Sequence, residues 1–488
     1  MLKKNYSSIG FAVILLCSAF ILLFLADYSS FLIWDEPVYL GNARSHIATS
    51  HFTEDFRFPL LEYVIAFVWS ITGESVTVAK TVMILFSLVS IVGFYLVSQQ
   101  FFKQKWIHLI STLMFSLSPL IFTWGFRIYT DIPSLAMLLF SMYFLLQGSC
   151  CKQSLYANGL MFISGIFISL SFLFRFSTII AFIPFALYVL FKQRFQSFMC
   201  LASGSLAALI PWLISNVMMY GNPIWDVLAQ GATISSYTTF QSPMILLRFL
   251  FQEFSIGLIL LLFALVSLAW KHPQRKYMIL MWSSFAMVLL FHLFIVRLKL
   301  SRYILMVLPF VLLLEMKGLE TINDFLKKIF FNKLFRQVLL IAIISVVLVY
   351  YGLSIASSAD ALSNKVECEN NASLKEAIKY VNVTLDPGDR IISNSPPWFG
   401  YYGNLKAYSF WMSPKELFAE HLDDYSFLFP ILKLLDPQKI IITNNQSYFI
   451  STDDLEYYGD EFISFEKSFT DACGMETVIY DVNLSVID

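Results

Sequence analysis

Two adjacent acidic residues, Asp35 and Glu36, stand a few positions beyond the first apolar segment of the chain, in the run from Trp34 to Tyr39. Ionised carboxylates are costly in or near hydrocarbon, so an acid pair at the end of a membrane segment indicates a chemical role. One such carboxylate can accept the proton of a hydroxyl group while that group attacks another atom. A solvated helix end or a helix N-cap is the alternative interpretation of the same pair.

Basic, acidic and aromatic residues recur where later apolar segments end. Arginine and lysine can neutralise a phosphate at a membrane surface and can stabilise the charge on a phosphate leaving group. Together with a carboxylate base, they suit the transfer of a sugar from a lipid-linked phosphate with inversion at the anomeric carbon. The residues that we consider for binding the sugar donor are Arg57, Asp131, Arg175, Lys299, Arg302 and Tyr303.

Several of these residues also have a purely structural interpretation. Arg175 could simply reach the membrane interface with its charged end while its stem stays in hydrocarbon. Asp131 could cap a helix that begins near Pro133. Arg302 and Tyr303 could anchor a helix at the interface, as arginine and tyrosine often do. The sequence leaves these alternatives open.

The composition indicates a membrane protein. Of the 488 residues, 58% are hydrophobic and only 14% are charged, whereas soluble domains carry about 25% charged residues. The formal net charge is -1, which gives no general electrostatic reason to expect a nucleic-acid partner. The sequence therefore predicts a polytopic α-helical membrane protein whose main environment is the lipid bilayer.

Apolar stretches of about 20 residues mark the expected membrane spans. We predict eleven of them, and the shorter segment 59–73, which carries Glu62, as an interfacial helix. The first span, preceded by Lys3 and Lys4, is interpreted as a retained signal anchor. The predicted spans are 9–26, 76–100, 107–125, 132–148, 157–174, 177–191, 197–215, 244–269, 277–296, 303–316 and 337–356.

The distribution of lysine and arginine predicts how the spans are oriented. With the N-terminus in the cytoplasm, more than twice as many basic residues fall in cytoplasmic loops as in outer loops. This asymmetry agrees with the positive-inside rule. We therefore expect a multi-pass protein of the cell membrane, with the acid pair on the outer face. An odd number of spans also places the C-terminal part outside.

The chain becomes polar after residue 356, so we predict two domains, 1–356 and 357–488. Residues 374–381 show helical spacing, and 390–393 and 439–443 are short strand signals, which together favour a small α/β domain. Cys368 and Cys473 could form a disulfide there or remain two free thiols. Sequons at Asn371, Asn382, Asn445 and Asn483 agree with an external location.

Four motifs taken together resemble the GT-C glycosyltransferases. They are the acid pair after the first span, Phe58-Pro59-Leu60, the loop from Arg127 to Pro133, and the segment from Lys299 to Pro309. Their order and their predicted outer location match across residues 9–316. The branch that the chain resembles most is the clan of protein O-mannosyltransferases and lipid A aminoarabinose transferases. The C-terminal part resembles the external α/β domains of many prokaryotic members.

The resemblance implies a role for each matched residue. Asp35 would be the catalytic base, and Glu36 would help to place the acceptor or tune its neighbour. Asp131 would line the cavity and contact the donor sugar or a divalent metal, which makes a metal possible, while His46 and His51 are not assigned to one. Lys299, Arg302 and Arg175 would bind the donor phosphate, Tyr303 would accompany them, and Arg57 would hold the first loop or meet the phosphate. The implied partners are a polyprenyl-phosphate sugar and a protein, lipid or glycan acceptor.

Two other functions compete with glycosyl transfer. A secondary transporter of a polar or lipid-linked solute is also polytopic and carries charges, but it usually shows repeated halves and ionisable residues near the middle of its spans. Here the charges lie at the predicted outer ends, and no internal repeat stands out. A non-catalytic scaffold with an external domain would not need an acid pair and cations on the same side. Glycosyl transfer is therefore favoured.

Overall fold

The structure is a computed structural model, and its described residues form two compact units. The helical unit comprises Met1–Tyr28, Phe56–Leu61 and Ala79–Asp360, and the α/β unit comprises Ser29–Asp55, Glu62–Val78 and Ala361–Asp488. The predicted division at residue 356 stays a prediction, and the α/β unit includes most of the first loop. The description leaves out residues 1, 29–31, 34, 52, 55–56, 152, 193–194, 238–239, 255–256, 270–274, 330–332, 370–371, 409–427, 444–462, 472–473 and 484–488.

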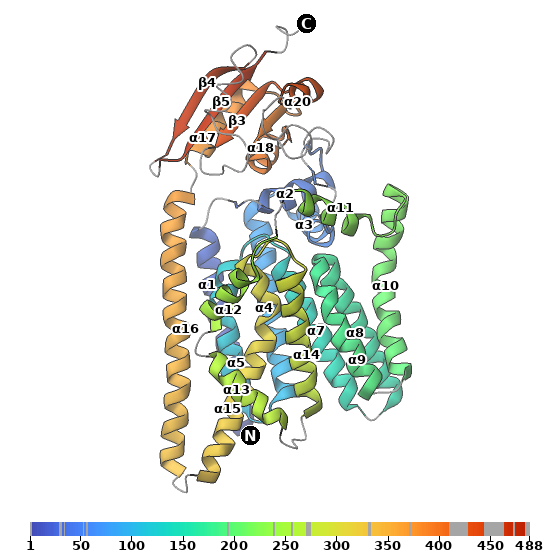
Figure 1. Ribbon diagram of the computed structural model, residues 1–488, viewed down its shortest axis with the longest axis vertical. Helices are drawn as coiled ribbons and strands as arrows, with labels where there is room; N and C mark the ends of the chain where they lie inside the picture. The colour runs from blue at the N-terminus through green and yellow to red at the C-terminus, as the bar shows by residue number, and fades with distance from the viewer. Residues whose placement is uncertain are drawn as a thin grey trace. The chain divides into compact units, whose positions relative to one another are not determined.

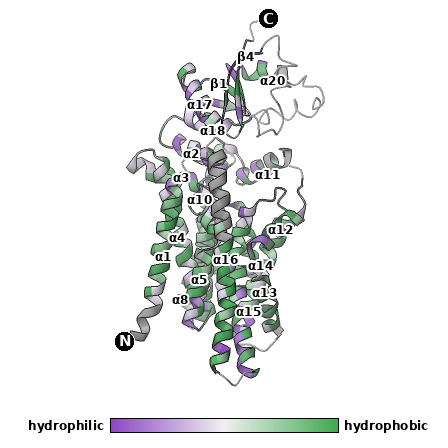
Figure 2. Ribbon diagram, turned by 90° about the vertical axis from the view of Figure 1, so that its left-hand side faces the viewer, coloured by the Kyte–Doolittle hydropathy of each residue, from purple (hydrophilic) through white to green (hydrophobic). Residues whose placement is uncertain are grey.

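The helical unit consists of helices that mostly follow the predicted apolar segments, whereas the helix Trp225–Tyr237 lies in none of them (Figure 1). Their residues are mostly hydrophobic, as Figure 2 shows. The helices of this unit are α1 (Leu2–Tyr28), α4 (Val76–Phe101), α5 (Lys105–Ser116), α6 (Pro119–Trp124), α7 (Asp131–Cys150), α8 (Ser154–Phe174), η1 (Phe176–Ala181), α9 (Phe182–Lys192), α10 (Phe195–Tyr220), α11 (Trp225–Tyr237), α12 (Pro243–Phe254), α13 (Gly257–Ala269), α14 (Arg275–Phe294), η2 (Ser301–Met306), α15 (Leu308–Ile329) and α16 (Lys333–Glu369).

Several predicted spans are broken helices rather than continuous ones. Among the described residues, seven helices are long and apolar enough to cross a membrane, or eight if the pair α12 and α13, which is bent by 94°, counts as one span. The predicted segments 107–125, 177–191 and 303–316 each consist of two shorter helical pieces. The expected class, a polytopic helical membrane protein with a small C-terminal sheet domain, is confirmed, and the count of eleven stays a prediction.

Two of these breaks lie beside buried carboxylates. Ser118, which precedes α6, accepts a hydrogen bond from the backbone N–H of Leu120 and donates one to Glu253 Oε1 at 2.7 Å. The carboxylate of Glu315 lies against Gly257, the first residue of α13, where a Cβ would clash with it. Broken helices are tolerated at membrane depth when neighbouring side chains provide for the freed polar groups. At Ser118 the polar contact comes from Glu253 of another helix, α12.

Small and hydroxylated residues bring α7, α8 and α10 together. Ser134 and Ser171 donate to each other's backbone carbonyls at 2.9 and 2.7 Å, and a second serine pair, Ser141 and Ser164, repeats the arrangement at 2.9 and 2.8 Å. A Cβ at Gly165 would clash with the backbone of α10. Small residues and interhelical hydrogen bonds of this kind let membrane helices approach closely. This packing fixes the ends of α7 and α8 relative to each other.

The α/β unit contains one five-stranded sheet in the order β2-β1-β3-β5-β4. β1 pairs in parallel with β2 and β3, whereas β5 is antiparallel to both β3 and β4. The strands are β1 (Arg390–Ser393), β2 (Lys406–Tyr408), β3 (Lys439–Thr443), β4 (Ile463–Thr470) and β5 (Glu476–Val482), and the helices are α2 (Asp35–Ser45), α3 (Leu60–Thr72), α17 (Ala372–Thr384), α18 (Pro396–Gly403) and α20 (Leu428–Leu435).

The local predictions for the C-terminal segment are confirmed. The expected helix at 374–381 lies within α17, and the expected strands are β1 and β3. β1 and β3 are central strands with buried residues, and α17 contributes Leu374, Ala377 and Val381 to the core. The predicted 59–73 segment forms the short apolar helix α3. Cys473 and the sequons at Asn371 and Asn445 lie outside the described residues, as does the side chain of Cys368, so the disulfide stays undecided.

Candidate functional site

The acid pair opens helix α2 and is buried. Asp35 is the first residue of the helix and is 9% exposed, and Glu36 is fully buried. The Ile33 backbone N–H donates to Glu36 Oε2 at 2.7 Å, while the backbone N–H of Glu36 donates to the Ile33 carbonyl at 2.8 Å. The Glu36 side chain thus reaches back to a backbone N–H just before the helix, as the Glu of a capping box does, while a backbone carbonyl takes the place of the capping side chain. The pair is therefore no solvated helix end, and Glu36 stabilises the helix start that carries Asp35.

Asp131 and Arg175 form a buried ion pair between the adjoining ends of α7 and α8. Arg175 Nη1 lies 2.9 Å from Asp131 Oδ1, and Asp131 is 1% exposed. Asp131 is the first residue of α7, and Arg175 directly follows the last residue of α8. Thr130 takes the N-cap position of α7 without a side-chain cap bond. Each residue thus has a charged partner in the structure. Helix capping by Asp131 or interface anchoring by Arg175 would not require such a partner.

Tyr303 links this ion pair to a second arginine. The guanidinium carbon of Arg175 lies 4.8 Å from the centre of the Tyr303 ring. The guanidinium carbon of Arg302 lies 4.4 Å from the ring centre of Tyr129 and 5.9 Å from those of Trp124 and Tyr303. Stacking on aromatic rings orients a guanidinium and leaves its charge in place. Two cations are thereby held around one buried tyrosine.

Lys299 has a different environment from the two arginines. Its ammonium group donates to the carbonyls of His292 and Leu293 at 2.8 Å each and also to the carbonyl of Val296. These carbonyls belong to the last residues of α14 and the turn after it, so Lys299 caps that end of the helix. An ammonium has three N–H donors, and these three bonds use all of them. Burial lowers the pKa of Lys299. The expected contact of Lys299 with the donor phosphate stays a prediction. It would require the ammonium group to give up one or more of its bonds to the backbone carbonyls.

The segment that contains Arg57 packs beside the chain around Arg175. The Phe58 ring lies 5.2 Å from that of Phe172 and 6.1 Å from that of Phe176, centre to centre. The same cluster includes Trp212. Because Phe172 and Phe176 flank Arg175 in the sequence, this packing brings the Arg57 segment to the same corner of the helical unit. The structure therefore groups Asp131, Arg175, Arg302 and Tyr303, and it brings the segment of Arg57 beside α8.

Sequence reasoning did not select three further residues of this region. The rings of Trp124 and Tyr129 make cation–π contacts with the Arg302 guanidinium. The ring centre of His292 lies 5.5 Å from that of Tyr303. Trp124 and Tyr129 flank Arg127 within five positions, so an aromatic-basic-aromatic spacing was the available signal. His292 Nδ1 pairs with the Val288 carbonyl at 2.8 Å. Nothing in its sequence context distinguishes it.

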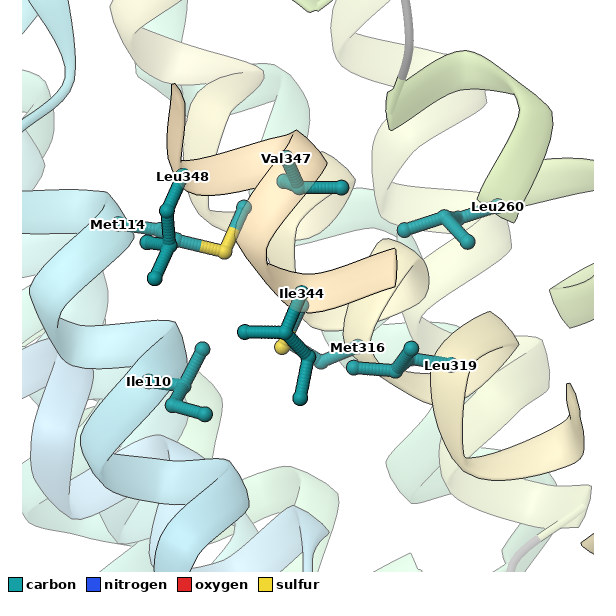
Figure 3. Close-up of a pocket in the computed structure, with 8 residues that line it drawn as sticks. All are labelled: Ile110, Met114, Leu260, Met316, Leu319, Ile344, Val347 and Leu348. Carbon is teal, nitrogen blue, oxygen red and sulfur yellow. The ribbon is translucent and has the colours of Figure 1, made fainter. Parts of the chain in front are cut away.

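An apolar pocket lies elsewhere in the helical unit. Figure 3 shows its lining side chains, which come from α5, α13, α15 and α16. These are Ile110, Met114, Leu260, Met316, Leu319, Ile344, Val347 and Leu348. All eight are hydrocarbon or thioether groups, which cannot exchange protons or hold a phosphate. The candidate chemistry therefore belongs to the charged groups around Asp131 and to the acid pair. Across the described part of the chain, no three or more His, Cys, Asp or Glu side chains gather into a metal site.

The chain is similar in fold to the GT-C membrane glycosyltransferases. The structure of ArnT from Cupriavidus metallidurans, bound to undecaprenyl phosphate, aligns with a TM-score of 0.66 over 96% of this chain and 98% of that one, at 13% identity. The apo state of ArnT aligns with a TM-score of 0.69 at 14% identity, over 97% of this chain and 98% of that one. The expected resemblance is confirmed at the level of the fold.

Two further comparisons point to the same fold group. Residues 57–220 match the family model for dolichyl-phosphate-mannose-protein mannosyltransferase. The archaeal oligosaccharyltransferase AglB from Archaeoglobus fulgidus, in complex with an inhibitory peptide and a dolichol-phosphate, aligns at 12% identity with a TM-score of 0.56, over 97% of this chain and 74% of that one. No curated protein matches the sequence. The family-model match includes Arg57, Asp131 and Arg175.

Proposed function

We propose that this protein is an inverting glycosyltransferase that moves a sugar from a polyprenyl-phosphate donor to a hydroxyl-bearing acceptor at the outer face of the cell membrane. The observation that carries the proposal is the group of two arginines, Arg175 and Arg302, around the buried Asp131 and Tyr303, which stands in a GT-C fold. Related folds bind undecaprenyl phosphate in ArnT and dolichol-phosphate in AglB. The acceptor class, protein, lipid or glycan, stays open.

The reaction requires one base and one stabilised leaving group. The acceptor oxygen attacks the anomeric carbon, the bond from that carbon to the phosphate oxygen breaks, and the electron pair of that bond goes to the phosphate. The acceptor's proton passes to the Asp35 carboxylate, which is the general base. Glu36 keeps the start of α2 in place through the hydrogen bond that it accepts from the Ile33 backbone N–H. A divalent ion at Asp131 is compatible with this scheme but is not needed for its proton balance.

The leaving phosphate is assigned to the two arginines. Arg302 presents a planar guanidinium supported by aromatic rings, and Arg175 is oriented by Asp131 and Tyr303. Planar guanidinium groups suit bidentate recognition of phosphate oxygens. The charge that develops on the departing phosphate is stabilised by cations that are already fixed before the reaction. Arg57 is the third candidate contact, because its segment packs beside Arg175.

Replacing Arg302 with alanine is expected to weaken donor use more than acceptor use. The lost guanidinium contacts the phosphate of the donor, so the KM for the polyprenyl-phosphate sugar should rise by about tenfold to a hundredfold, with a small change in the KM for the acceptor. Steady-state transfer with purified protein, after a screen of polyprenyl-phosphate sugars, measures both constants. Arg248→Ala, at an exposed arginine of α12, is the control. Equal losses for donor and acceptor would contradict a phosphate role.

The proposed orientation predicts which surfaces are open to the outside of the cell. A cysteine placed at Lys379, an exposed residue of α17, should react with a membrane-impermeant maleimide on intact cells. A cysteine at the exposed Lys103 should react only after permeabilisation. Both variants are made in a background whose six native cysteines are replaced by serine. The opposite labelling pattern would place the acid pair in the cytoplasm and end the proposal of transfer at the outer face.

A further inference from the structure

Helix α2, which begins with the acid pair, shares a hydrophobic core with the C-terminal segment. Val38 is fully buried and belongs to the same cluster as Leu374 of α17, Trp398 of α18 and Ile441 of β3. The side chain of a residue three positions after Asp35 is thus part of the core of the α/β unit. The position of α2 therefore depends on residues more than 300 positions away in the sequence.

One face of α18 contacts the residues just before Asp35. Trp398 Nε1 donates to the Leu32 carbonyl at 2.9 Å. The hydroxyl of Tyr402 hydrogen-bonds the backbone of Leu32 and lies within electrostatic range of Glu36, and burial followed by the nearby Glu36 charge raises the pKa of Tyr402. Trp398 and Tyr402 are four positions apart, so they lie on the same side of the helix. The turn that leads into Asp35 is therefore held from two points of α18.

The far end of α2 is tied to the same helix. Arg44 Nη1 donates to the Tyr401 carbonyl at 2.7 Å, and its guanidinium carbon lies 4.4 Å from the Tyr401 ring centre. Arg44 also donates through Nε to both carboxylate oxygens of Glu74 at 3.0 Å. The Tyr401 hydroxyl completes the arrangement at 3.3 Å from Glu74. Bidentate arginine contacts fix direction as well as distance. Both ends of α2 are thus held by α18.

We infer that α18 is the positioning element for the acid pair, with Trp398, Tyr402 and Arg44 as positioning residues that act on Asp35 through the backbone of α2. The inference rests on the proposed function, because it assigns these residues to the geometry of the proposed base. None of the three needs to touch substrate. A general base must be held within a fraction of an ångström of its productive geometry by surrounding packing and hydrogen bonds. The C-terminal segment is thereby part of the catalytic apparatus and not only an appended domain.

The test is Trp398→Phe, which keeps an aromatic ring but removes the N–H that binds the Leu32 carbonyl. We expect amide exchange in the peptide 35–45 to become about fivefold faster, the change expected from the loss of one hydrogen bond. We also expect kcat to fall by about tenfold while the KM for the polyprenyl-phosphate donor stays the same, because the donor residues belong to the helical unit. Hydrogen exchange followed by mass spectrometry and steady-state transfer by the full-length protein measure the two effects.

Trp106→Phe is the matched control, because Trp106 also donates through Nε1, to Gln104 Oε1 at 2.8 Å, but in the helical unit. It should change neither exchange in 35–45 nor kcat. Unchanged exchange in Trp398→Phe, or faster exchange with an unchanged kcat, would overturn the inference. A general loss of folded protein would speed exchange throughout and would not single out α2. If the wild-type protein transfers no sugar from any donor, the proposed function fails, and the exchange data still decide whether α18 holds α2.

Discussion

Replacing Asp35 with asparagine is expected to abolish sugar transfer while the protein stays folded. Asparagine has nearly the same shape as aspartate but cannot take the proton from an attacking hydroxyl. Positioned general bases contribute about 10²–10⁴-fold to rate, so we expect kcat to fall by about a thousandfold. The helix start is held by Glu36 and the Ile33 backbone, which the substitution leaves intact. Transfer from a polyprenyl-phosphate sugar and thermal stability in detergent are the two measurements.

Two neighbouring acidic residues provide the controls for this result. Asp27→Asn changes an exposed carboxylate at the end of α1 and should leave kcat unchanged. Glu36→Gln keeps an oxygen that can accept from the Ile33 N–H, so its effect should be clearly smaller than that of Asp35→Asn. Normal turnover by Asp35→Asn would remove Asp35 from the mechanism. A larger loss for Glu36→Gln than for Asp35→Asn would exchange the two assignments.

Local patterns in the sequence were sufficient for much of the fold. The helix α17 and the strands β1 and β3 follow from apolar residues at helical or strand spacing between clear turn signals. Long apolar runs likewise predict α4, α7 and α8 close to their observed bounds, whereas α1 begins at Leu2, well before its predicted span 9–26. In each case the information lies within one segment, because the hydrophobic face is repeated along that segment itself.

The broken spans could not be predicted in the same way. A continuous apolar run at 107–125 or 244–269 favours one helix, yet the first run forms α5 and α6 and the second forms α12, which ends at Phe254, and α13, which begins at Gly257. Ser118 donates to Glu253 of α12, and the carboxylate of Glu315 of α15 lies against Gly257. A break at membrane depth depends on such neighbours. Its position is therefore a property of the packed bundle and not of the segment.

The candidate site shows the same limit. Asp131, Arg175 and Arg302 stand out as charges at the ends of apolar runs, so they could be selected individually. Their grouping depends on the serine pair of α7 and α8, which sets Asp131 opposite Arg175. The capping role of Lys299 depends on how the chain turns after α14. The hydrogen bond from Trp398 to the Leu32 carbonyl joins residues 366 positions apart. No periodicity connects such distant residues.

The ion pair of Asp131 and Arg175 gives the second large expected effect, and it separates stability from donor binding. Arg175→Met should destabilise the protein by about 3–5 kcal/mol, because it leaves the buried Asp131 charge without its partner. It should also raise the donor KM at least tenfold, since one of the cationic side chains proposed to bind the donor phosphate is lost. The double variant Asp131→Asn with Arg175→Met buries no unpaired charge, so its stability should largely return while its donor KM stays high. Thermal unfolding in detergent and donor titration of the transfer reaction measure the two quantities.

Asp324→Asn, which breaks the exposed pair with Lys327, is the control. It should change the stability by no more than about 0.5 kcal/mol and should leave the donor KM unchanged. A double variant that regains both stability and normal donor use would show that the pair only supports the fold, and the phosphate would then have to be bound without Arg175.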